Sequence, residues 1–463
     1  SEDAGRKTKL TQSGSLERSG DMSRLNILNV NDPGFAAAAL RTHEGAPALQ
    51  ISAEAQLRRS VLACMLWENQ FYENGVTIAD RIAALVPRVE AAKVAALAIE
   101  AREQMKLRHA PLLLVREMAR YATHRGLVAE TLARVIQRAD ELAEFLAIYW
   151  KDGRQPLAAQ VKKGLAAAFS KFDAHALAKY DRDGVVKLRD VLFLTHAKPV
   201  TAEQALTWRQ LIEGELPSPE TWEVRLSRGE QKREVWESLL IENRLGALAL
   251  LRNLRNMQGA GVEPELVQHA LAAIRVERVL PFRFVAAARY APQWEPWLEQ
   301  AMFLSLQGQS RLAGRTVLLV DVSGSMDARL SARSEMLRMD AAAGLAVLVR
   351  EIADEVGVYT FSERLQAVPA RRGFALRDAI AQSQPHSGTY LGRALEELRD
   401  SYDRLIVITD EQSHDRVPAP RGRGYVVNVA SFRNGVGYGD WTHIDGWSEA
   451  VIEYIRSHEQ MEF

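Results

Sequence analysis

The spacing of apolar residues changes near Gly308, and this change is the feature that most constrains the fold of the chain. From about Glu54 to Gln309, apolar residues recur every three or four positions, as in Leu112, Val115 and Met118. Such spacing is typical of amphipathic helices. After Gly308, short β-branched runs alternate with helical stretches, which indicates a parallel, doubly wound α/β fold. The sequence therefore predicts a helical part followed by an α/β domain.

The helical part is interrupted at short intervals by glycine and proline, and it contains no convincing alternating strand. We expect about a dozen short helices over about 250 residues, stacked in pairs as a HEAT-like α-solenoid rather than as a single bundle. No strict sequence period is present. The repeat interpretation therefore depends on the succession of helices alone.

The α/β part is predicted in more detail. Strands are expected at Thr316 to Val322, Val356 to Phe361, Arg404 to Thr409 and Tyr425 to Val429. Helices are expected at Asp340 to Ala353, Phe374 to Ala381, Tyr390 to Ser401 and Trp447 to Ile455. The expected division is a disordered tail at 1–21, a helical repeat domain at 22–310 and an α/β domain at 313–463.

Five oxygen-bearing side chains gather at the ends of the predicted strands. Asp321, Ser323 and Ser325 follow the first strand, Thr389 precedes a helix, and Asp410 follows the strand that ends at Thr409. In open α/β sheets, ligands bind at the carboxyl ends of the strands. Carboxylates and hydroxyls suit a hard divalent cation, Mg²⁺ above all. Hydroxyl ligands leave the ion under-neutralised, so the site could also accept an acidic ligand from outside.

This pattern, Asp-x-Ser-x-Ser with a later Thr and a later Asp, resembles the metal-ion-dependent adhesion site of the von Willebrand factor A domain. The resemblance implies that Ser323, Ser325 and Thr389 contact the metal. It also implies that Asp321 and Asp410 act on the metal through water.

Several motifs upstream of the α/β domain follow one another in a fixed order. They are Lys162-Lys163, Lys179-Tyr180, Leu188-Arg189-Asp190-Val191-Leu192, Thr195-His196-Ala197-Lys198-Pro199, Val235-Trp236-Glu237-Ser238-Leu239-Leu240, Ala249-Leu250-Leu251-Arg252-Asn253-Leu254 and Pro281-Phe282. In this order they resemble the TROVE domain of the Ro autoantigen family and its bacterial relatives, which also leads into a von Willebrand factor A domain. The resemblance extends over roughly residues 50 to 463.

The resemblance implies a ring of helical repeats that is closed by the A domain. It implies binding of the single-stranded 3′ ends of misfolded non-coding RNA in the hole of the ring, and of Y RNA on the outer surface. It also implies work with an exoribonuclease in RNA quality control or maturation. The family's Trp-Ser-His element has no counterpart here, where Val186, Lys187 and Leu188 stand, so Y RNA binding stays open.

Charge segregation makes RNA binding physically reasonable. The chain as a whole is neutral, with 59 basic and 59 acidic residues. Between Arg154 and Lys198, however, nine cations face four acids, and Lys and Arg neutralise phosphates without reading sequence. The candidate RNA-binding residues are Lys162, Lys163, Lys171, Lys179, Arg116, Arg120 and His196. Charged helix residues usually form a solvated face, and His196 could equally cap or pack within its turn. A second basic group comprises Arg102, Lys106, Arg108, His109, Arg116 and Arg120.

The single cysteine, Cys64, excludes an internal disulfide framework and fits a reducing compartment. No signal-peptide segment and no apolar run of membrane-spanning length is evident. We therefore expect a cytoplasmic protein, monomeric and without a membrane partner.

Two alternatives to an RNA-binding protein stay open. The first is a protein-binding adaptor that grips an acidic residue of a partner through the A-domain metal, with the helices as a scaffold. The second is a metal-dependent hydrolase. Because no nucleophile–base pair can be assembled from the sequence, we do not expect an enzyme.

Overall fold

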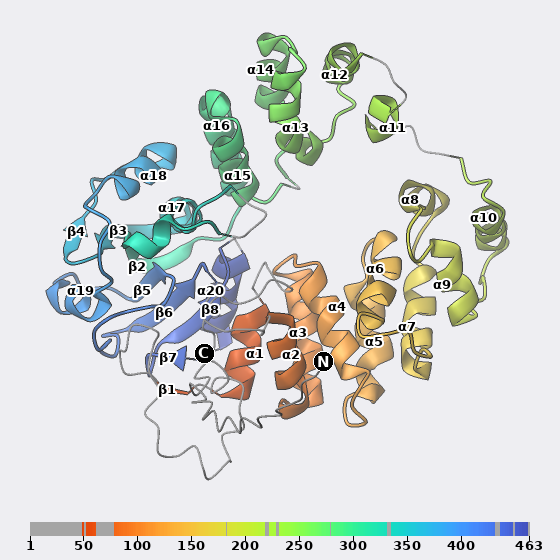
Figure 1. Cartoon of the computed structure of the whole chain (residues 1–463), viewed down its shortest axis with the longest axis horizontal. Coiled ribbons are helices and arrows are strands. Elements are labelled where there is room, and N and C mark those ends of the chain that lie inside the picture. Colours follow the sequence, from red (N-terminus) through yellow and green to blue (C-terminus); the bar gives the residue numbers. More distant parts are fainter. Residues whose placement is uncertain are drawn as a thin grey trace, which may run out of the picture.

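The structure is a computed structural model that combines a helical part with a single α/β domain (Figure 1). It describes residues 49–50, 52–61, 78–181, 183–217, 222–227, 231–277, 279–330, 335–430, 436–447 and 450–461. The expected tail at 1–21 and Cys64 lie outside these residues. None of the described helices has both the length and the apolar character needed to cross a bilayer.

The first helices of the helical part form two adjoining rows. One row contains α3 (Ala91–Glu103), α5 (Arg125–Val135), α7 (Ala159–Phe169) and α9 (Leu188–Thr195), and the other contains α2 (Ile78–Leu85), α4 (His109–Met118) and α6 (Asp140–Tyr149). The short α8 (Ala174–Tyr180) and α10 (Ala202–Glu213) pack beyond α9. Helices α2 to α5, α7 and α8 each contact the next helix but one in the chain, and α6 contacts α9. This is the packing of an α-solenoid.

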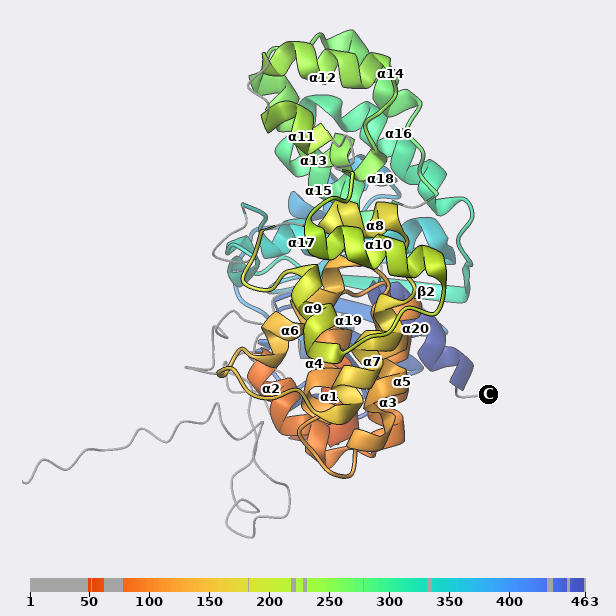
Figure 2. The ribbon, with the colours of Figure 1, turned by 90° about the vertical axis from the view of Figure 1, so that its right-hand side faces the viewer.

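The same arrangement continues in the second half of the helical part. Its helices are α11 (Trp222–Ser227), α12 (Lys232–Ile241), α13 (Ala247–Gly259), α14 (Pro264–Ala272), α15 (Phe282–Tyr290) and α16 (Glu295–Leu306). Helices α12, α14 and α16 form one row, and α13 packs on α15. Helices α12 and α14 lie side by side in both ribbon views (Figures 1 and 2).

The α/β domain is built on a six-stranded sheet in the order β4-β3-β2-β5-β6-β8. Its strands are β2 (Leu312–Asp321), β3 (Ala353–Phe361), β4 (Leu365–Ala367), β5 (Arg404–Thr409), β6 (Arg423–Asn428) and β8 (Thr442–Asp445). All neighbours pair in parallel except β4, which is antiparallel to β3. The helices are α17 (Arg338–Ile352), α18 (Gly373–Ala381), α19 (Leu391–Glu397) and α20 (Ala450–Met461).

The central strand is buried on both faces, as its apolar sequence predicts. Leu318 and Val320 belong to a core that includes α17 and α20 and continues into the helical part. Val317 and Leu319 belong to a smaller core that includes α19. Because successive side chains of a strand point to opposite faces, the sheet is covered on both sides and is doubly wound.

The N-terminal helix α1 (Ala53–Val61) joins the helical part to the far edge of the sheet. It packs against β8, and its neighbour β1 (Leu49–Gln50) pairs with β7 (Val436–Gly437). The fully buried Arg59 donates to Glu411 and, over 3.1 Å, to Asp445. We call this ion-paired contact of α1 with the α/β domain the Arg59 clasp. With the continuous chain, it closes the molecule into a ring.

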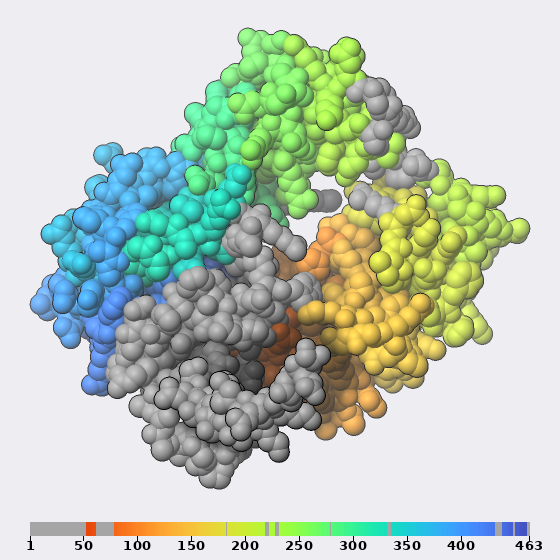
Figure 3. Space-filling view, in the orientation of Figure 1, coloured from red at the N-terminus to blue at the C-terminus, as the bar shows by residue number. Residues whose placement is uncertain are grey.

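The ring surrounds an opening, which Figure 3 shows between α12–α13 on one side and the α4–α8 region on the other. The predicted fold class, a helical repeat ring followed by a doubly wound α/β domain, is therefore confirmed. In the sequence, the last helix of the ring ends at Leu306 and the first strand of the sheet begins at Leu312. In space the two parts share one core and the Arg59 clasp.

Candidate metal centre and ring opening

Three loops meet at the carboxyl ends of β2 and β5. Asp321 is the last residue of β2, and its Oδ1 accepts a 2.8 Å hydrogen bond from the Ser323 backbone. The Ser323 and Ser325 hydroxyls lie 3.2 Å apart. The Gly324 backbone donates to the Ser387 carbonyl over 2.9 Å, which ties this loop to the segment that carries Thr389.

Two buried carboxylates face each other across this junction. Asp321 and Asp410 are both fully buried. Burial, and then the negative charge of Asp410, raises the pKa of Asp321 to about 7. Burial raises the pKa of Asp410 too. Asp410 Oδ1 has no hydrogen-bond partner among the described residues. Two acids held this close are stabilised by a cation between them.

The donor set fits a hard divalent ion better than a thiolate- or imidazole-bound one. Nowhere in the described part of the chain do three His, Cys, Asp or Glu side chains gather as metal ligands. A metal here must therefore take hydroxyl oxygens alongside the two carboxylates, as the sequence predicts. Thr389 is buried, and its carbonyl accepts from the His414 backbone over 2.8 Å, which fixes the Thr389 turn beside the loop after β5.

A cation of the chain itself already lies at this site, which the sequence did not lead us to expect. Arg338, the first residue of α17, is buried. Its Nη1 donates to Asp410 Oδ2 over 3.0 Å and to the Ser325 carbonyl over 3.1 Å. The guanidinium therefore neutralises Asp410 and holds the serine loop.

A second cluster, of arginines, lies at the opening of the ring. Arg252 is on α13 and Arg283 on α15, and both side chains are exposed. Partial burial, and then the positive charges of Arg283, Arg138 and Arg108, lowers the pKa of Arg252. Arg108 precedes α4, and Arg138 lies between α5 and α6, across the opening from α13 in Figure 1. Arginines from both sides therefore lie close enough to repel one another, and we call these four the rim arginines.

The rim arginines differ in their partners. Arg108 donates to Asp140 over 2.5 Å and to Glu144, and Arg138 also pairs with Asp140. Neither Arg252 nor Arg283 has a carboxylate partner among the residues that the structure describes. An excess of positive charge is therefore left on the α13–α15 side of the opening.

Two of the predicted RNA-binding lysines lie next to Arg138. Lys179 and Arg138 both lie over the ring of Tyr180, at 5.5 and 5.0 Å from its centroid. Lys171 Nζ donates to the carbonyls of Ala133, over 2.5 Å, and Ile136 at the end of α5, and burial lowers its pKa. Lys171 thus supports the loop that carries Arg138, whereas Lys179 presents its charge at the surface.

Most of the second basic group is used in internal ion pairs. Arg116 is buried and donates to Glu117 and, over 2.5 Å, to Asp152. Arg120 donates to the same Asp152 carboxylate over 2.7 Å. Arg102, too, is buried and donates to Glu141 over 2.5 Å. Arg116 and Arg120 are thus both paired with carboxylates, Asp152 among them at the surface, and their role in RNA binding stays a prediction.

The remaining predicted residues lie on the helices as expected but apart from the rim arginines. Lys163 is exposed and Lys162 half-buried on α7, and neither pairs with a carboxylate in the described part of the chain. His196 is exposed and has a φ of 53°, so it ends α9 in the left-handed conformation. A capping role therefore accounts for His196 without a ligand.

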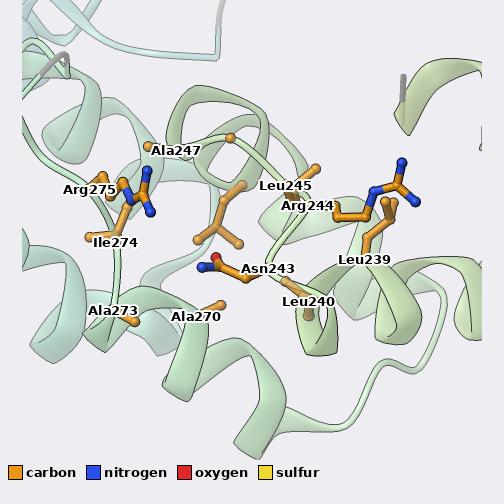
Figure 4. A pocket seen from close by; sticks show the side chains of 12 residues that line it. Leu239, Leu240, Asn243, Arg244, Leu245, Ala247, Ala270, Ala273, Ile274 and Arg275 are labelled. Atoms are coloured by element: carbon orange, nitrogen blue, oxygen red, sulfur yellow. The ribbon is translucent and has the colours of Figure 1, made fainter. Parts of the chain in front are cut away.

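A pocket of about 280 Å³ lies between the α12–α13 turn and the end of α14 (Figure 4). Asn243 points into it, with Arg244 and Arg275 on opposite sides. No acidic side chain lines it. Because Arg244 is paired with Glu242 at 3.5 Å, Arg275 is the cation that this pocket adds beside the segment that carries Arg252.

Arg283, Arg138 and Arg338 were not predicted as site residues from the sequence, where Arg252 stands out only as part of the Leu250–Leu254 motif. A weak signal existed for Arg252, because no acid stands three or four residues away from it on α13. Nothing in the sequence brings Arg108 or Arg138 near to Arg252, since their proximity depends on closure of the ring.

Comparison with known proteins agrees with this architecture. Residues 213–301, which contain Arg252 and Arg283, match the TROVE domain. "Telomerase protein component 1" of Mus musculus and of Rattus norvegicus are each 40% identical to this chain over 79 residues, or 16% of it. The chain spans only 3% of the length of these relatives. A Deinococcus radiodurans Ro (RSR) protein structure superimposes with a TM-score of 0.60, at 20% identity, over 89% of this chain and 100% of that one.

These findings confirm the predicted resemblance to TROVE-domain proteins of the Ro type. The TROVE match includes the Leu250-Leu251-Arg252-Asn253-Leu254 motif. It does not extend to the block from Lys162 to Pro199, on which the resemblance was also based.

Proposed function

We propose that this chain, which carries a TROVE-domain segment and shares its fold with a Ro protein, is a non-catalytic RNA-binding protein. It takes the single-stranded 3′ ends of misfolded or structured non-coding RNA into the opening of its ring, in RNA quality control or maturation. The observation that carries the proposal is the convergence of the four rim arginines on that opening.

The rim arginines have the properties that a phosphate backbone requires. A single strand brings one negative charge per nucleotide, and its neutralisation by Arg releases counterions without reading the bases. Arg252 and Arg283 are exposed and have no carboxylate partner among the described residues, so their charge is available to a ligand. Tyr180 beside Arg138 offers an aromatic ring on which a base could stack.

Filter binding at several salt concentrations tests this function. The ligand is an RNA hairpin with a single-stranded 3′ tail. We expect Arg252→Ala with Arg283→Ala to weaken binding about tenfold or more and to lower the salt slope by about 0.7 for each phosphate that the variant no longer neutralises. Blunt-ended hairpin RNA should bind much less tightly than the tailed form.

The control is Arg209→Ala on α10, because Arg209 is exposed and paired with Glu213 at 2.9 Å, outside the rim arginines. It should leave binding unchanged. Lys162→Ala with Lys163→Ala tests the basic pair on α7 separately and should also lower the slope. Negligible RNA affinity at every salt concentration would favour the adaptor alternative and refute the proposal.

We also propose that the α/β domain binds a divalent cation, Mg²⁺ in the first instance. Ser323, Ser325 and Thr389 would hold it directly, and Asp321 and Asp410 through water. Bound there, the ion supplies an open coordination position for an acidic ligand. The orphaned oxygen of Asp410 and the two mutually repelling carboxylates support this assignment.

Titration calorimetry with Mg²⁺ tests the metal site. Thr389→Ala should weaken binding, because it removes one of three hydroxyl ligands, and should leave the helical circular dichroism signal unchanged. Loss of helical signal would contradict separate roles for the metal site and the ring.

An exoribonuclease partner, Y RNA binding, a monomeric state and a cytoplasmic location stay predictions.

A further inference from the structure

Arg338 distinguishes this metal centre from one built only of acids and hydroxyls. The residue is 2% exposed, and its guanidinium lies against Asp410, 3.0 Å from Oδ2. The same Nη1 donates to the Ser325 carbonyl over 3.1 Å. A fixed positive charge is therefore built into the first turn of α17, directly beside the predicted metal ligands.

The charge balance of the site decides what this arginine does. Asp321 and Asp410 in their ionised forms bring two negative charges, and Arg338 brings one positive charge. A divalent cation added to these three groups leaves one net positive charge in a buried place. Without Arg338, the same cation and the two carboxylates would be neutral. Charges interact strongly where water is excluded. This difference of one charge therefore changes the binding free energy of both the metal and its ligand.

From this balance we infer that Arg338 makes metal binding at this site depend on a singly charged anionic ligand. The guanidinium repels the metal and competes with it for Asp410, so the metal alone binds weakly. A monoanion at the open position restores neutrality, so the metal and the anion bind cooperatively. This inference rests on the metal site proposed above.

Exposed residues from three loops surround the buried oxygen donors. Asp321, Ser323, Thr389 and Asp410 are buried, whereas Gly324, Ser387 and His414 are exposed. A small monoanion can therefore approach the site between these loops. Acetate and dimethyl phosphate are two such anions, of different shape.

Calorimetric titration of the full chain with Mg²⁺ tests the inference at one pH and one ionic strength. Parallel titrations contain sodium acetate, sodium dimethyl phosphate or sodium chloride. In the unaltered protein, acetate should tighten Mg²⁺ binding by about tenfold. In Arg338→Met, Mg²⁺ alone should bind about tenfold more tightly than in the unaltered protein, and acetate should add little.

Two further variants separate the effect of the positive charge at residue 338 from an effect of the substitution on the fold. Arg338→Lys keeps the positive charge and should keep the acetate effect. Arg289→Met is the matched control, because Arg289 also contacts the first turn of α17, 3.1 Å from Asp340, but does not contact the metal residues. It should behave like the unaltered protein.

The outcomes distinguish this inference from the metal proposal on which it rests. If no Mg²⁺ binds with or without acetate, the metal site itself is refuted. If Mg²⁺ binds equally well in all three salts, or if Arg338→Met weakens binding of Mg²⁺ alone, then Arg338 only positions Asp410 and the inference fails. Tighter Mg²⁺ binding in acetate or in dimethyl phosphate than in chloride supports the inference and shows which shape of anion the site accepts.

Discussion

At the scale of single residues, the arginines of this chain fall into two groups. In the first group, which includes Arg59, Arg116 and Arg338, the side chain is buried and paired with carboxylates. Breaking such a pair leaves an uncompensated buried charge and costs about 3–5 kcal/mol. In the second group, which includes Arg252 and Arg283, the side chain is exposed without a described carboxylate partner. The first group stabilises the fold, and the second is available to a ligand.

Asp445 in the Arg59 clasp makes stability depend on pH. Burial, and then the negative charge of Glu411, raises the pKa of Asp445 to about 7. Its pKa is then higher in the folded chain than in the unfolded one. Protonated Asp445 therefore favours the folded chain. This contribution to the free energy of unfolding is complete below pH 4 and is lost as the pH rises through 7. The free energy of unfolding should therefore fall by up to about 1.4 kcal/mol per pH unit between pH 5 and 7 and level off above.

Asp445→Asn removes this titration, so its melting temperature should vary less with pH than that of the unaltered protein. Thermal unfolding of both proteins from pH 5 to pH 8 provides the measurement. Parallel curves for the two proteins over this range would show that Asp445 does not titrate there.

At the scale of elements, one close helix contact sets the spacing of the first row. Gly164 of α7 lies against α5, and a Cβ added there would lie 2.9 Å from the Ala129 carbonyl oxygen and from Leu132 Cβ. Only glycine fits, because both neighbours are parts of a packed helix. The row of α3, α5, α7 and α9 depends on this approach.

Gly164→Ala should lower the free energy of unfolding by about 1–3 kcal/mol, because α5 and α7 must move apart. Gly126→Ala is the control, since Gly126 is on α5 and has no atom within 4 Å of the added Cβ. It should be neutral or stabilising by up to about 1 kcal/mol, because alanine favours helix. Urea unfolding of both variants measures the difference; equal effects would exclude close packing as the cause.

Helices and strands with a clear apolar pattern of their own were predictable from the sequence. The strand expected at Arg404 to Thr409 is β5, residue for residue. The strands β4, β7 and β8 were not predicted. They have two to four residues, too few for an alternating pattern to stand out. Strand β4 pairs with β3 across a short turn, whereas β7 pairs with the distant β1. The helix expected at Tyr390 to Ser401 is shorter, since α19 ends at Glu397.

At the scale of the whole molecule, the Arg59 clasp is the buried ion-paired contact at the point where the ring closes. Arg59→Met leaves Glu411 and Asp445 buried without their guanidinium, so we expect a loss of about 3–5 kcal/mol. Small-angle scattering should show a larger radius of gyration as α1 leaves the sheet. Lys93→Met is the control, because Lys93 pairs with Glu54 of α1 at 2.7 Å with both side chains about half exposed. An unchanged radius for Arg59→Met would show that other contacts hold the ring closed.

The candidate metal centre was more predictable than the rim arginines. Asp321, Ser323 and Ser325 are within five residues of one another, so their spacing already places them on one loop. Arg108 and Arg252 are brought together only by the curvature of many stacked helices and by the Arg59 clasp. That curvature is the sum of small angles between successive packed helices. No local sequence pattern encodes this sum. Arg59, too, was missed, because an arginine on a helix next to polar residues looks like a solvated one.

Closure of the ring by the Arg59 clasp has a topological consequence. The polypeptide, the Arg59 clasp and the pairing of β1 with β7 together form a loop without a gap at the sheet edge. A linear polymer can pass through such a loop from its terminus, whereas a covalently circular polymer of the same sequence stays outside until α1 detaches. Discrimination between linear and circular molecules would then follow from connectivity alone, independent of any base or any charge.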